Sequence, residues 1–292
     1  MKTVLDTVGN TPLVELKKLN TNPSAKIYAK LEGNNPGGSV KDRPALNMIK
    51  RALERGDISP NTKLIEATSG NTGIAMALMA NLFNLEIELI MPSSSTKERV
   101  LTMEAFGAKV TLLDSMEACR DYAEEKGASD DYFLLNQFAN PDNYTAHYQT
   151  TGPEIWRDTQ GTITHFVSAM GTTGTIIGTS MFLKEQNSSI QIIGCQPTED
   201  SSIPGIRRWP QAYLPKIFDP KRVDCILDIS QKEATDTTRR LAKEEGIFAG
   251  MSSGGAASAA IRIASEIKCG TIVFIVCDRG DRYLSSTLFE SL

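Results

Sequence analysis

Lys41 is the residue of this sequence whose position is best suited to chemistry. It lies in residues 37–43, GGSVKDR, directly before a segment, 44–55, whose apolar residues recur at helical spacing. The positive end of a helix dipole disfavours a nearby ammonium, so it favours the free amine that a nucleophile or a Schiff-base former requires. Because most lysines are solvated surface residues, the prediction depends on the motifs that accompany Lys41.

Three small, polar loops are each predicted to connect a strand to a helix, which is where open α/β sheets bind their ligands. They are residues 68–73 (TSGNTG), 171–175 (GTTGT) and 250–256 (GMSSGGA). The first offers hydroxyls and exposed N–H groups suited to a carboxylate, and the second offers the close backbone approach suited to a phosphate. Each loop alone is also explained by ordinary helix capping. Together with Lys41, the loops indicate a site for a ligand with one phosphate and one ring. They also indicate a second ligand that bears a carboxylate, while the amine of Lys41 would form an imine.

The elements that must position these loops alternate between strand and helix. The predicted strands are 13–16, 25–31, 63–67, 87–91, 110–113, 164–168, 190–195 and 271–276. The predicted helices are 44–55, 74–82, 96–106 with Ser95 as its cap, 116–126, 175–185, one between Ser230 and Gly246, and 256–267. Such alternation predicts an α/β fold with mostly parallel sheets covered by helices on both faces. The polar and aromatic segment 136–148 is the predicted boundary between two domains.

Composition narrows the classes of protein further. A chain of 292 residues is long enough for two domains of about 150 residues. The formal net charge of −4 disfavours a nucleic-acid partner, while five scattered cysteines and two histidines disfavour a disulfide framework and a metal site. Loop 171–175 is not a dinucleotide-binding GxGxxG, and no P-loop is present. The start of the chain lacks a signal peptide's apolar core and no apolar run approaches a membrane span, so we expect a cytoplasmic protein without a membrane partner.

The order and content of three motifs resemble a known family. Residues 38–43 (GSVKDR), 68–73 and 171–175 resemble those of the fold-type II pyridoxal-phosphate enzymes, specifically the cysteine synthases, or O-acetylserine sulfhydrylases. The similarity extends from residue 9 to residue 283, and residues 202–209 (SIPGIRRW) and 277–283 (CDRGDRY) resemble the B-type isozymes, which also accept thiosulfate.

The resemblance implies a fold, an organisation and a reaction. The fold is that of two α/β domains with mostly parallel twisted sheets, like the β subunit of tryptophan synthase. One domain would comprise residues 1–12 and 36–145, the other 13–35 and 146–292, with pyridoxal 5'-phosphate in the cleft between them, in a homodimer. The reaction would be β-replacement, making L-cysteine or S-sulfocysteine, and acetate, from O-acetyl-L-serine and sulfide or thiosulfate.

The resemblance also implies roles for individual residues. Lys41 would hold the cofactor through a Schiff base and then take the Cα proton of the substrate. Asn71 would contact the oxygen on the cofactor ring and Ser252 the pyridine nitrogen. The phosphate would be bound by Gly171, Thr172, Thr173, Gly174 and Thr175. The substrate carboxylate would be bound by Thr68, Ser69, Thr72 and Gln137. Thiosulfate would be selected by one or more of Arg207, Arg208 and Cys277.

Two alternatives stay open at this point. Another enzyme with the same cofactor, a serine or threonine dehydratase or a cystathionine β-synthase-like protein, would share the motifs, although Ser39-Val40-Lys41 is not the Ser-Phe-Lys often seen in dehydratases. A non-catalytic α/β protein that binds a phosphorylated metabolite would use Lys41 only as an anion contact. The sequence makes no prediction about binding of a serine acetyltransferase.

Overall fold

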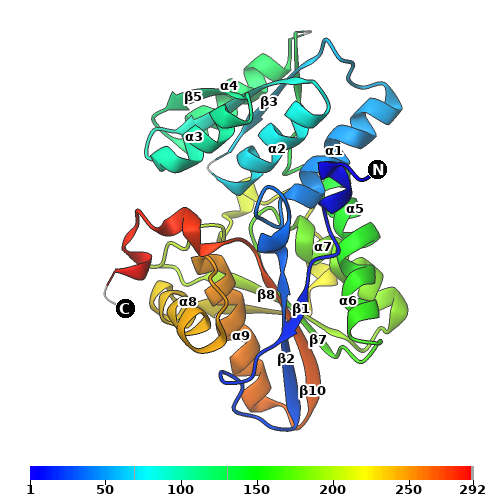
Figure 1. The fold of residues 1–292 in the computed structure, drawn as a ribbon, viewed down its shortest axis with the longest axis vertical. Coiled ribbons are helices and arrows are strands. Elements are labelled where there is room, and N and C mark those ends of the chain that lie inside the picture. Colours follow the sequence, from blue (N-terminus) through cyan, green and yellow to red (C-terminus); the bar gives the residue numbers. More distant parts are fainter. Residues whose placement is uncertain (69, 130, 291–292) are drawn as a thin grey trace. The chain divides into compact units, whose positions relative to one another are not determined.

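The computed structural model describes residues 1–68, 70–129 and 131–290, and the chain divides into two compact units. The first unit comprises Met1–Val8 and Lys41–Asn143, and the second comprises Gly9–Val40 and Tyr144–Leu292. Figure 1 shows the path of the chain through both units, which the colours follow from the N-terminus to the C-terminus. The domain boundaries expected from the sequence lie after residues 12, 35 and 145, and that finer assignment stays a prediction.

The first unit is built on a parallel sheet with strand order β5-β4-β3-β6. Its strands are β3 (Lys63–Ala67), β4 (Glu86–Pro92), β5 (Lys109–Leu113) and β6 (Tyr132–Leu134). Its helices are α1 (Asp42–Arg55), α2 (Asn71–Leu82), α3 (Lys97–Ala105) and α4 (Met116–Gly127), and α5 (Pro141–Ala146) begins at its end. Leu64 packs in a core with α1, α2 and α3, whereas the next residue, Ile65, packs with α4. Successive strand residues point to opposite faces, so helices cover both faces of this sheet (Figure 1).

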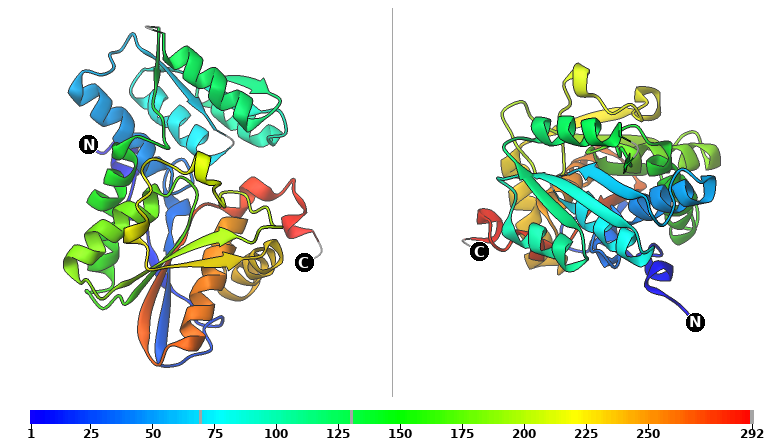
Figure 2. Two further views of the ribbon diagram at one scale, coloured as in Figure 1. Left: turned by 180° about the vertical axis from the view of Figure 1, so that it is seen from behind. Right: turned by 90° about the horizontal axis from the view of Figure 1, so that it is seen from above.

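The second unit is built on a mostly parallel sheet with strand order β1-β2-β10-β7-β8-β9. Its strands are β1 (Leu13–Glu15), β2 (Ala25–Leu31), β7 (His165–Ala169), β8 (Gln191–Pro197), β9 (Cys225–Ile229) and β10 (Gly270–Val276), of which only β1 is antiparallel to its neighbour. Its helices are α6 (Gly152–Asp158), α7 (Gly174–Gln186), α8 (Gln231–Glu245) and α9 (Met251–Glu266). Figure 2 shows α9, in orange, lying along the strands of this sheet.

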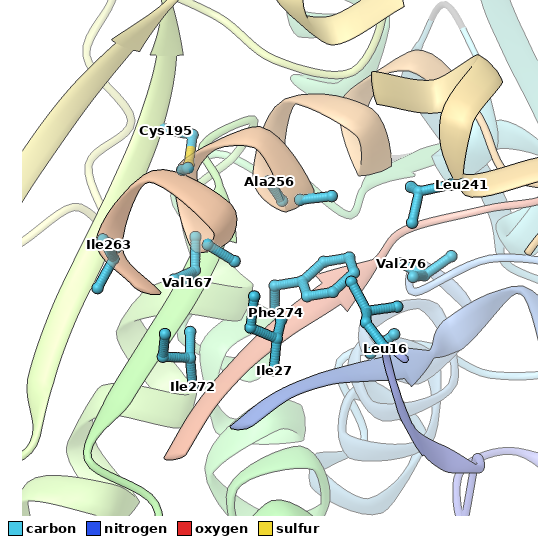
Figure 3. Packing of buried hydrophobic residues seen from close by; sticks show 14 of the residues in the cluster. Leu16, Ile27, Val167, Cys195, Leu241, Ala256, Ile263, Ile272, Phe274 and Val276 are labelled. Carbon is cyan, nitrogen blue, oxygen red and sulfur yellow. The ribbon is translucent and has the colours of Figure 1, made fainter. Parts of the chain in front are cut away.

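The core of the second unit also has two sides. Phe274 of β10 packs with Ile27, Leu16 and residues of α8 and α9, as Figure 3 shows, whereas its neighbours Val273 and Ile275 pack with α6 and α7. Each of these fully buried apolar side chains contributes about 1.5–3 kcal/mol to folding. The predicted α/β fold, with mostly parallel sheets and helices on both faces, is therefore confirmed.

A buried ion cluster also stabilises the second unit. Lys30 of β2 is fully buried, and its Nζ donates to the carbonyl oxygen of Thr11 at 2.7 Å. The same ammonium lies 2.8 Å from Glu154 Oε2 and 3.3 Å from Asp158 Oδ2, both on α6. A buried charge without partners is costly, so the ammonium of Lys30 favours the arrangement in which α6 keeps its two carboxylates next to β2.

Two predicted helix starts were wrong. Helix α9 begins at Met251 rather than at residue 256, and α2 begins at Asn71 rather than at residue 74. Glycine usually disfavours a helix, but Gly254 lies inside α9 because a Cβ there would collide with Thr238 Oγ1 and the Ala234 carbonyl of α8. Gly73 likewise lies inside α2, where a Cβ would come within 2.6 Å of Thr68 Cγ2 and Met103 Cε. Close packing, not turn formation, explains these glycines.

The remaining differences from the sequence prediction are small. Helix α3 is capped by Thr96 rather than Ser95. The short strands β6 and β9 were not predicted, and the segment 136–148 contains α5, which continues into a π-helix, His147–Thr151, and then α6. None of the helices in the described part of the chain has the length and apolar composition needed to span a bilayer.

Candidate functional site

Lys41 directly precedes α1 in the first unit, as its motif predicted. Its backbone has φ −76° and ψ −13°, and its carbonyl oxygen accepts a hydrogen bond from the N–H of Ala45 at 3.1 Å. Its side chain is partly buried, and α1 packs on α2. Lys41 is therefore held at the N-terminal end of a helix that adjoins another predicted binding element.

Thr68 follows β3 and shapes the start of α2. Its Oγ1 accepts a hydrogen bond from the backbone N–H of Gly73 at 3.2 Å and lies 3.4 Å from that of Gly70. The side chain is buried, so this hydroxyl organises the loop that precedes the helix. Asn71 is the first residue of α2, and Ser69, predicted to bind the substrate carboxylate, lies outside the described residues. The N–H groups in the first turn of α2 have no acceptor within the helix and are suited to an anion.

Gln137 and Thr72 are brought together at the carboxyl edge of the same sheet. The Thr72 hydroxyl donates to Gln137 Oε1 at 2.8 Å, and both side chains are buried. Gln137 Nε2 donates to the carbonyl oxygen of Ala67 at 3.3 Å and to Glu66 Oε1 at 3.4 Å. This contact arises because β3 and β6, which precede these residues, are adjacent parallel strands. Two of the predicted carboxylate-binding residues therefore belong to one hydrogen-bonded network.

Glu66 belongs to this network and was not predicted from the sequence. It lies in β3 and is only 2% exposed. Burial raises the pKa of its carboxyl to about 8, although the backbone of Asn136 and Gln137 and the Gln137 side chain oppose that rise. A charged residue inside the otherwise apolar strand segment LIEA was the signal that could have identified it.

In the second unit, the predicted phosphate loop is strained. It follows β7 and ends at Thr173, which caps α7 with φ +71°, a conformation that a β-branched residue rarely adopts. The Thr173 side chain is buried, and its Oγ1 has no hydrogen-bond partner among the described residues. An unmet hydroxyl at a strained helix N-terminus fits a bound phosphate, because the phosphate accepts from both the hydroxyl and the backbone N–H groups. Thr172, Gly174 and Thr175 are also buried in this loop and the first turn of α7.

His147 supports this loop and was not predicted as a site residue. It is buried in the π-helix, and its ring lies between two threonines: Nδ1 is 2.8 Å from Thr151 Oγ1, and Nε2 is 3.3 Å from Thr175 Oγ1. The imidazole therefore orients the hydroxyl of Thr175, which is one of the residues predicted to bind the phosphate. A π-helix often marks a functional position, but its hydrogen-bond pattern cannot be read from a sequence.

Ser252 and Gly171 are connected through Gly205. Ser252 is buried in the first turn of α9, and a Cβ built on Gly205 would lie 3.3 Å from Ser252 Oγ. The carbonyl oxygen of Gly205 would in turn lie 3.0 Å from a Cβ built on Gly171, whose own carbonyl accepts from Trp209 Nε1 at 2.7 Å. The residues predicted for the ring nitrogen and for the phosphate therefore lie at one edge of the second unit, next to the loop that follows β8.

The three residues predicted to select thiosulfate have different surroundings. Cys277 follows β10, and its N–H donates to Ser253 Oγ at 2.9 Å, which places it beside the first turn of α9. Arg208 is engaged elsewhere, because its Nε donates to the carbonyl of Pro197 at 2.9 Å and its Nη2 lies 2.5 Å from Asp228 Oδ1. Arg207 is exposed, and its backbone N–H donates to the carbonyl oxygen of Met170, next to the phosphate loop, at 2.9 Å. The two adjacent arginines are thus not equivalent.

Known proteins are similar to this chain over nearly its whole length. The family model of the pyridoxal-phosphate dependent enzymes matches residues 4–278. Cysteine synthase B of Pseudomonas aeruginosa is 57% identical over 291 residues, covering 99% of this chain and 97% of that protein. Cysteine synthase B of Escherichia coli (strain K12) is 54% identical over 292 residues, covering 99% and 96%.

A solved structure agrees with the sequence comparisons. The crystal structure of a cysteine synthase from Entamoeba histolytica superimposes with a TM-score of 0.94 at 37% identity, covering 100% of this chain and 91% of that one. The resemblance stated from the motifs is confirmed, and so is pyridoxal 5'-phosphate as the cofactor. The chain belongs to the pyridoxal-phosphate dependent enzymes and, within them, to the cysteine synthases.

Proposed function

We propose that the chain catalyses β-replacement on O-acetyl-L-serine, forming L-cysteine and acetate with sulfide, and S-sulfocysteine with thiosulfate. The observation that carries the proposal is the loop at the start of α7, where a strained backbone and a buried Thr173 hydroxyl, without a hydrogen-bond partner in the part of the chain that the structure describes, fit the phosphate of the cofactor. Cysteine synthase B relatives that match 99% of the chain support the choice of reaction.

The cofactor, when bound, supplies an electron sink for the electron pair released at Cα of the amino acid. The chain's own residues hold it and move the proton. Gly171, Thr172, Thr173, Gly174 and Thr175 would hold the phosphate, and Asn71 the ring oxygen. Lys41 would hold the cofactor covalently and then, as a released amine next to Cα, take the Cα proton. Ser252, a neutral hydroxyl, would contact the ring nitrogen without keeping it protonated, which favours loss of the β-acetate over competing reactions.

The start of α2 would bind the substrate carboxylate. Thr68, Ser69, Thr72 and Gln137 are the proposed residues. The Thr68 hydroxyl already accepts from the loop N–H groups, and both N–H groups of the Gln137 amide already have acceptors in the protein. We therefore expect the backbone N–H groups at this helix start to make the first contacts, and Gln137 to join by exchanging one of its acceptors for the carboxylate.

For the sulfur donor, Arg207 and Cys277 are stronger candidates than Arg208. Thiosulfate carries two negative charges, so its binding requires cationic or hydrogen-bonding groups. Arg207 is exposed beside the segment that contacts the phosphate loop, and Cys277 lies beside the first turn of α9, whereas Arg208 is paired with Asp228. We further propose that the protein works as a homodimer in the cytoplasm.

Product analysis tests the proposed reaction. The purified holoenzyme is given O-acetyl-L-serine with sulfide or with thiosulfate, and the products are separated by chromatography, with the Lys41→Ala variant as control. We expect cysteine and S-sulfocysteine, respectively. Release of pyruvate from serine, or of 2-oxobutyrate from threonine, without β-replacement would instead identify a dehydratase. A colourless protein that converts none of these substrates would identify a phosphometabolite-binding protein.

A further inference from the structure

Glu66 is a buried acid for which the proposed reaction has no use. It lies near the end of β3, immediately before the Ala67 carbonyl and the loop that leads to α2. Its Oε1 faces Gln137 Nε2 at 3.4 Å, while its Oε2 is buried and has no hydrogen-bond partner among the described residues. A carboxyl in this position, half bonded and half unmet, needs a physical explanation because burying such a group without partners is costly.

The orientation of the Gln137 amide follows from its neighbours. The Ala67 carbonyl can only accept, so the amide nitrogen of Gln137 must face it, and the second N–H then points to Glu66. The amide oxygen is occupied by the Thr72 hydroxyl at 2.8 Å. Both N–H groups of Gln137 are therefore engaged, and a substrate carboxylate can bind this amide only by displacing Ala67 or Glu66.

A small pocket adjoins Glu66. Its volume is about 20 Å³, enough for one water molecule, and Glu66, Arg120, Glu124, Asn136 and Phe138 contribute to its wall. Arg120 and Glu124, both from α4, are the charged side chains that line it besides Glu66. Cys119 of α4 is a further titratable group packed nearby, against Ala67. The pocket therefore leaves room for a water molecule beside the Glu66 side chain.

We propose that Glu66 is a positioning residue that competes with the substrate carboxylate for the side-chain amide of Gln137, and that its protonation releases the amide. The proposal rests on the proposed role of Gln137 in carboxylate binding. An ionised carboxylate accepts a charge-assisted hydrogen bond and holds the amide N–H, whereas a protonated carboxyl is a weaker acceptor. Ionised Glu66 also repels a second carboxylate at the same amide.

The direction of the pH effect follows from these charges. Burial raises the pKa of Glu66 to about 8, so the side chain is mostly protonated at neutral pH and ionises as the pH rises through that value. The affinity for a carboxylate ligand should therefore decrease above about pH 8. By linkage, a bound carboxylate ligand should raise the pKa of Glu66 further, because it favours the protonated form.

Three variants of the holoenzyme test the proposal, with L-serine as the probe ligand and its Kd measured from the change in the cofactor's absorption. Glu66→Gln keeps the shape but cannot ionise. Glu124→Gln removes the same charge from the same pocket without a contact to Gln137. Gln137→Ala tests the proposed carboxylate role itself. The ratio of the variant Kd to the unmodified Kd is taken at each pH, so that the titration of the ligand's own amine cancels.

We expect Glu66→Gln to bind L-serine about fivefold more tightly than the unmodified protein well above the Glu66 pKa and equally well below it, with Glu124→Gln unchanged throughout. A flat ratio for Glu66→Gln would overturn the proposal. An unchanged Kd in Gln137→Ala would refute the role of Gln137 in carboxylate binding and would therefore overturn this proposal too.

A second measurement does not depend on the variant's stability. Infrared difference spectra of the unmodified holoenzyme follow the carboxyl band of Glu66 as the pH is raised, with and without L-serine, and the band is assigned from its absence in Glu66→Gln. We expect L-serine to raise the pH at which the band disappears. If L-serine leaves that pH unchanged, Glu66 does not compete with the carboxylate.

Discussion

The two units present binding edges of opposite character. In the first unit, Thr68, Thr72 and Gln137 are already hydrogen-bonded to the protein, so a carboxylate must exchange partners with them. In the second unit, Thr173 is strained and its hydroxyl has no partner within the described residues, so on the proposed assignment a phosphate would complete the loop without displacing a protein group there. A resident cofactor favours a preformed cradle, whereas a substrate that must enter and leave favours groups that can exchange partners.

Removal of the Lys41 amine should have the largest effect. On its proposed role, Lys41 supplies both the covalent attachment of the cofactor and the base for the Cα proton, so we expect turnover of Lys41→Ala to fall by about 10³-fold or more. Rate measurements with O-acetyl-L-serine and sulfide check the loss, and circular dichroism checks that the fold is retained. A folded variant with near-normal turnover would refute the assignment of Lys41.

The stability of the second unit should depend on the ion cluster around the buried Lys30. Lys30→Met leaves the buried carboxylate of Glu154, next to that of Asp158, without its cation, so we expect the free energy of unfolding to fall by about 3–5 kcal/mol in chemical denaturation. Lys17→Met is the matched control, because Lys17 pairs with Glu15 on the surface and should change stability by less than about 1 kcal/mol. Equal effects of the two variants would show that burial of the cluster is unimportant.

The contrast between the edges can be tested at Thr173 itself. Thr173→Gly relieves the left-handed backbone and removes the unmet hydroxyl, so we expect about 10- to 100-fold weaker cofactor binding with less than about 1 kcal/mol change in the stability of the cofactor-free protein. Gln160→Gly is the control, since exposed Gln160 also has a positive φ, of 53°, away from the loop, and should leave cofactor affinity unchanged. Unchanged cofactor affinity in Thr173→Gly would mean that the strain has no role in binding.

A further prediction separates the adjacent arginines. Arg207→Ala should lower kcat/KM with thiosulfate more than kcat/KM with sulfide. The difference corresponds to a loss of about 1–3 kcal/mol of transition-state stabilisation, the scale of a charged hydrogen bond. Arg208→Ala should lower both efficiencies equally, because its guanidinium is bonded to Pro197 and Asp228. Comparison of kcat/KM for both donors gives the answer, and a selective loss in Arg208→Ala alone would reverse the assignment.

Much of the fold was predictable because local patterns agree with the final packing. The buried run of β10 and the alternating residues of β2 were recognised, as was the capping box of α8, in which Ser230 and Glu233 bond each other's backbone. Edge strand β9 was missed because its residues are mostly exposed and carry no clear apolar pattern. The start of α9 was misjudged because Gly254 has a tertiary role that only the position of α8 explains.

The motifs located the candidate site, but the contacts within it were not predictable. Loop 171–175 was predicted from its residue types to bind a phosphate, yet the positive φ of Thr173 depends on how α7 begins. Glu66 and Gln137 are 71 positions apart, and His147 is 28 from Thr175, so no local spacing relates them. The pairing of β3 with β6 and the π-helix bring these groups together.

The pairing of β2 with β10 also determines the order in which the chain can fold during its synthesis. Strand β2 is made early, but its parallel partner, from Gly270 to Val276, is made only after the whole sheet of the first unit. All of the first unit's sheet is translated between them, so that unit can complete its core while the second still lacks the strand between β2 and β7. The nascent second unit therefore exposes unpaired strand edges until β10 has been made, and such edges are prone to aggregation during folding.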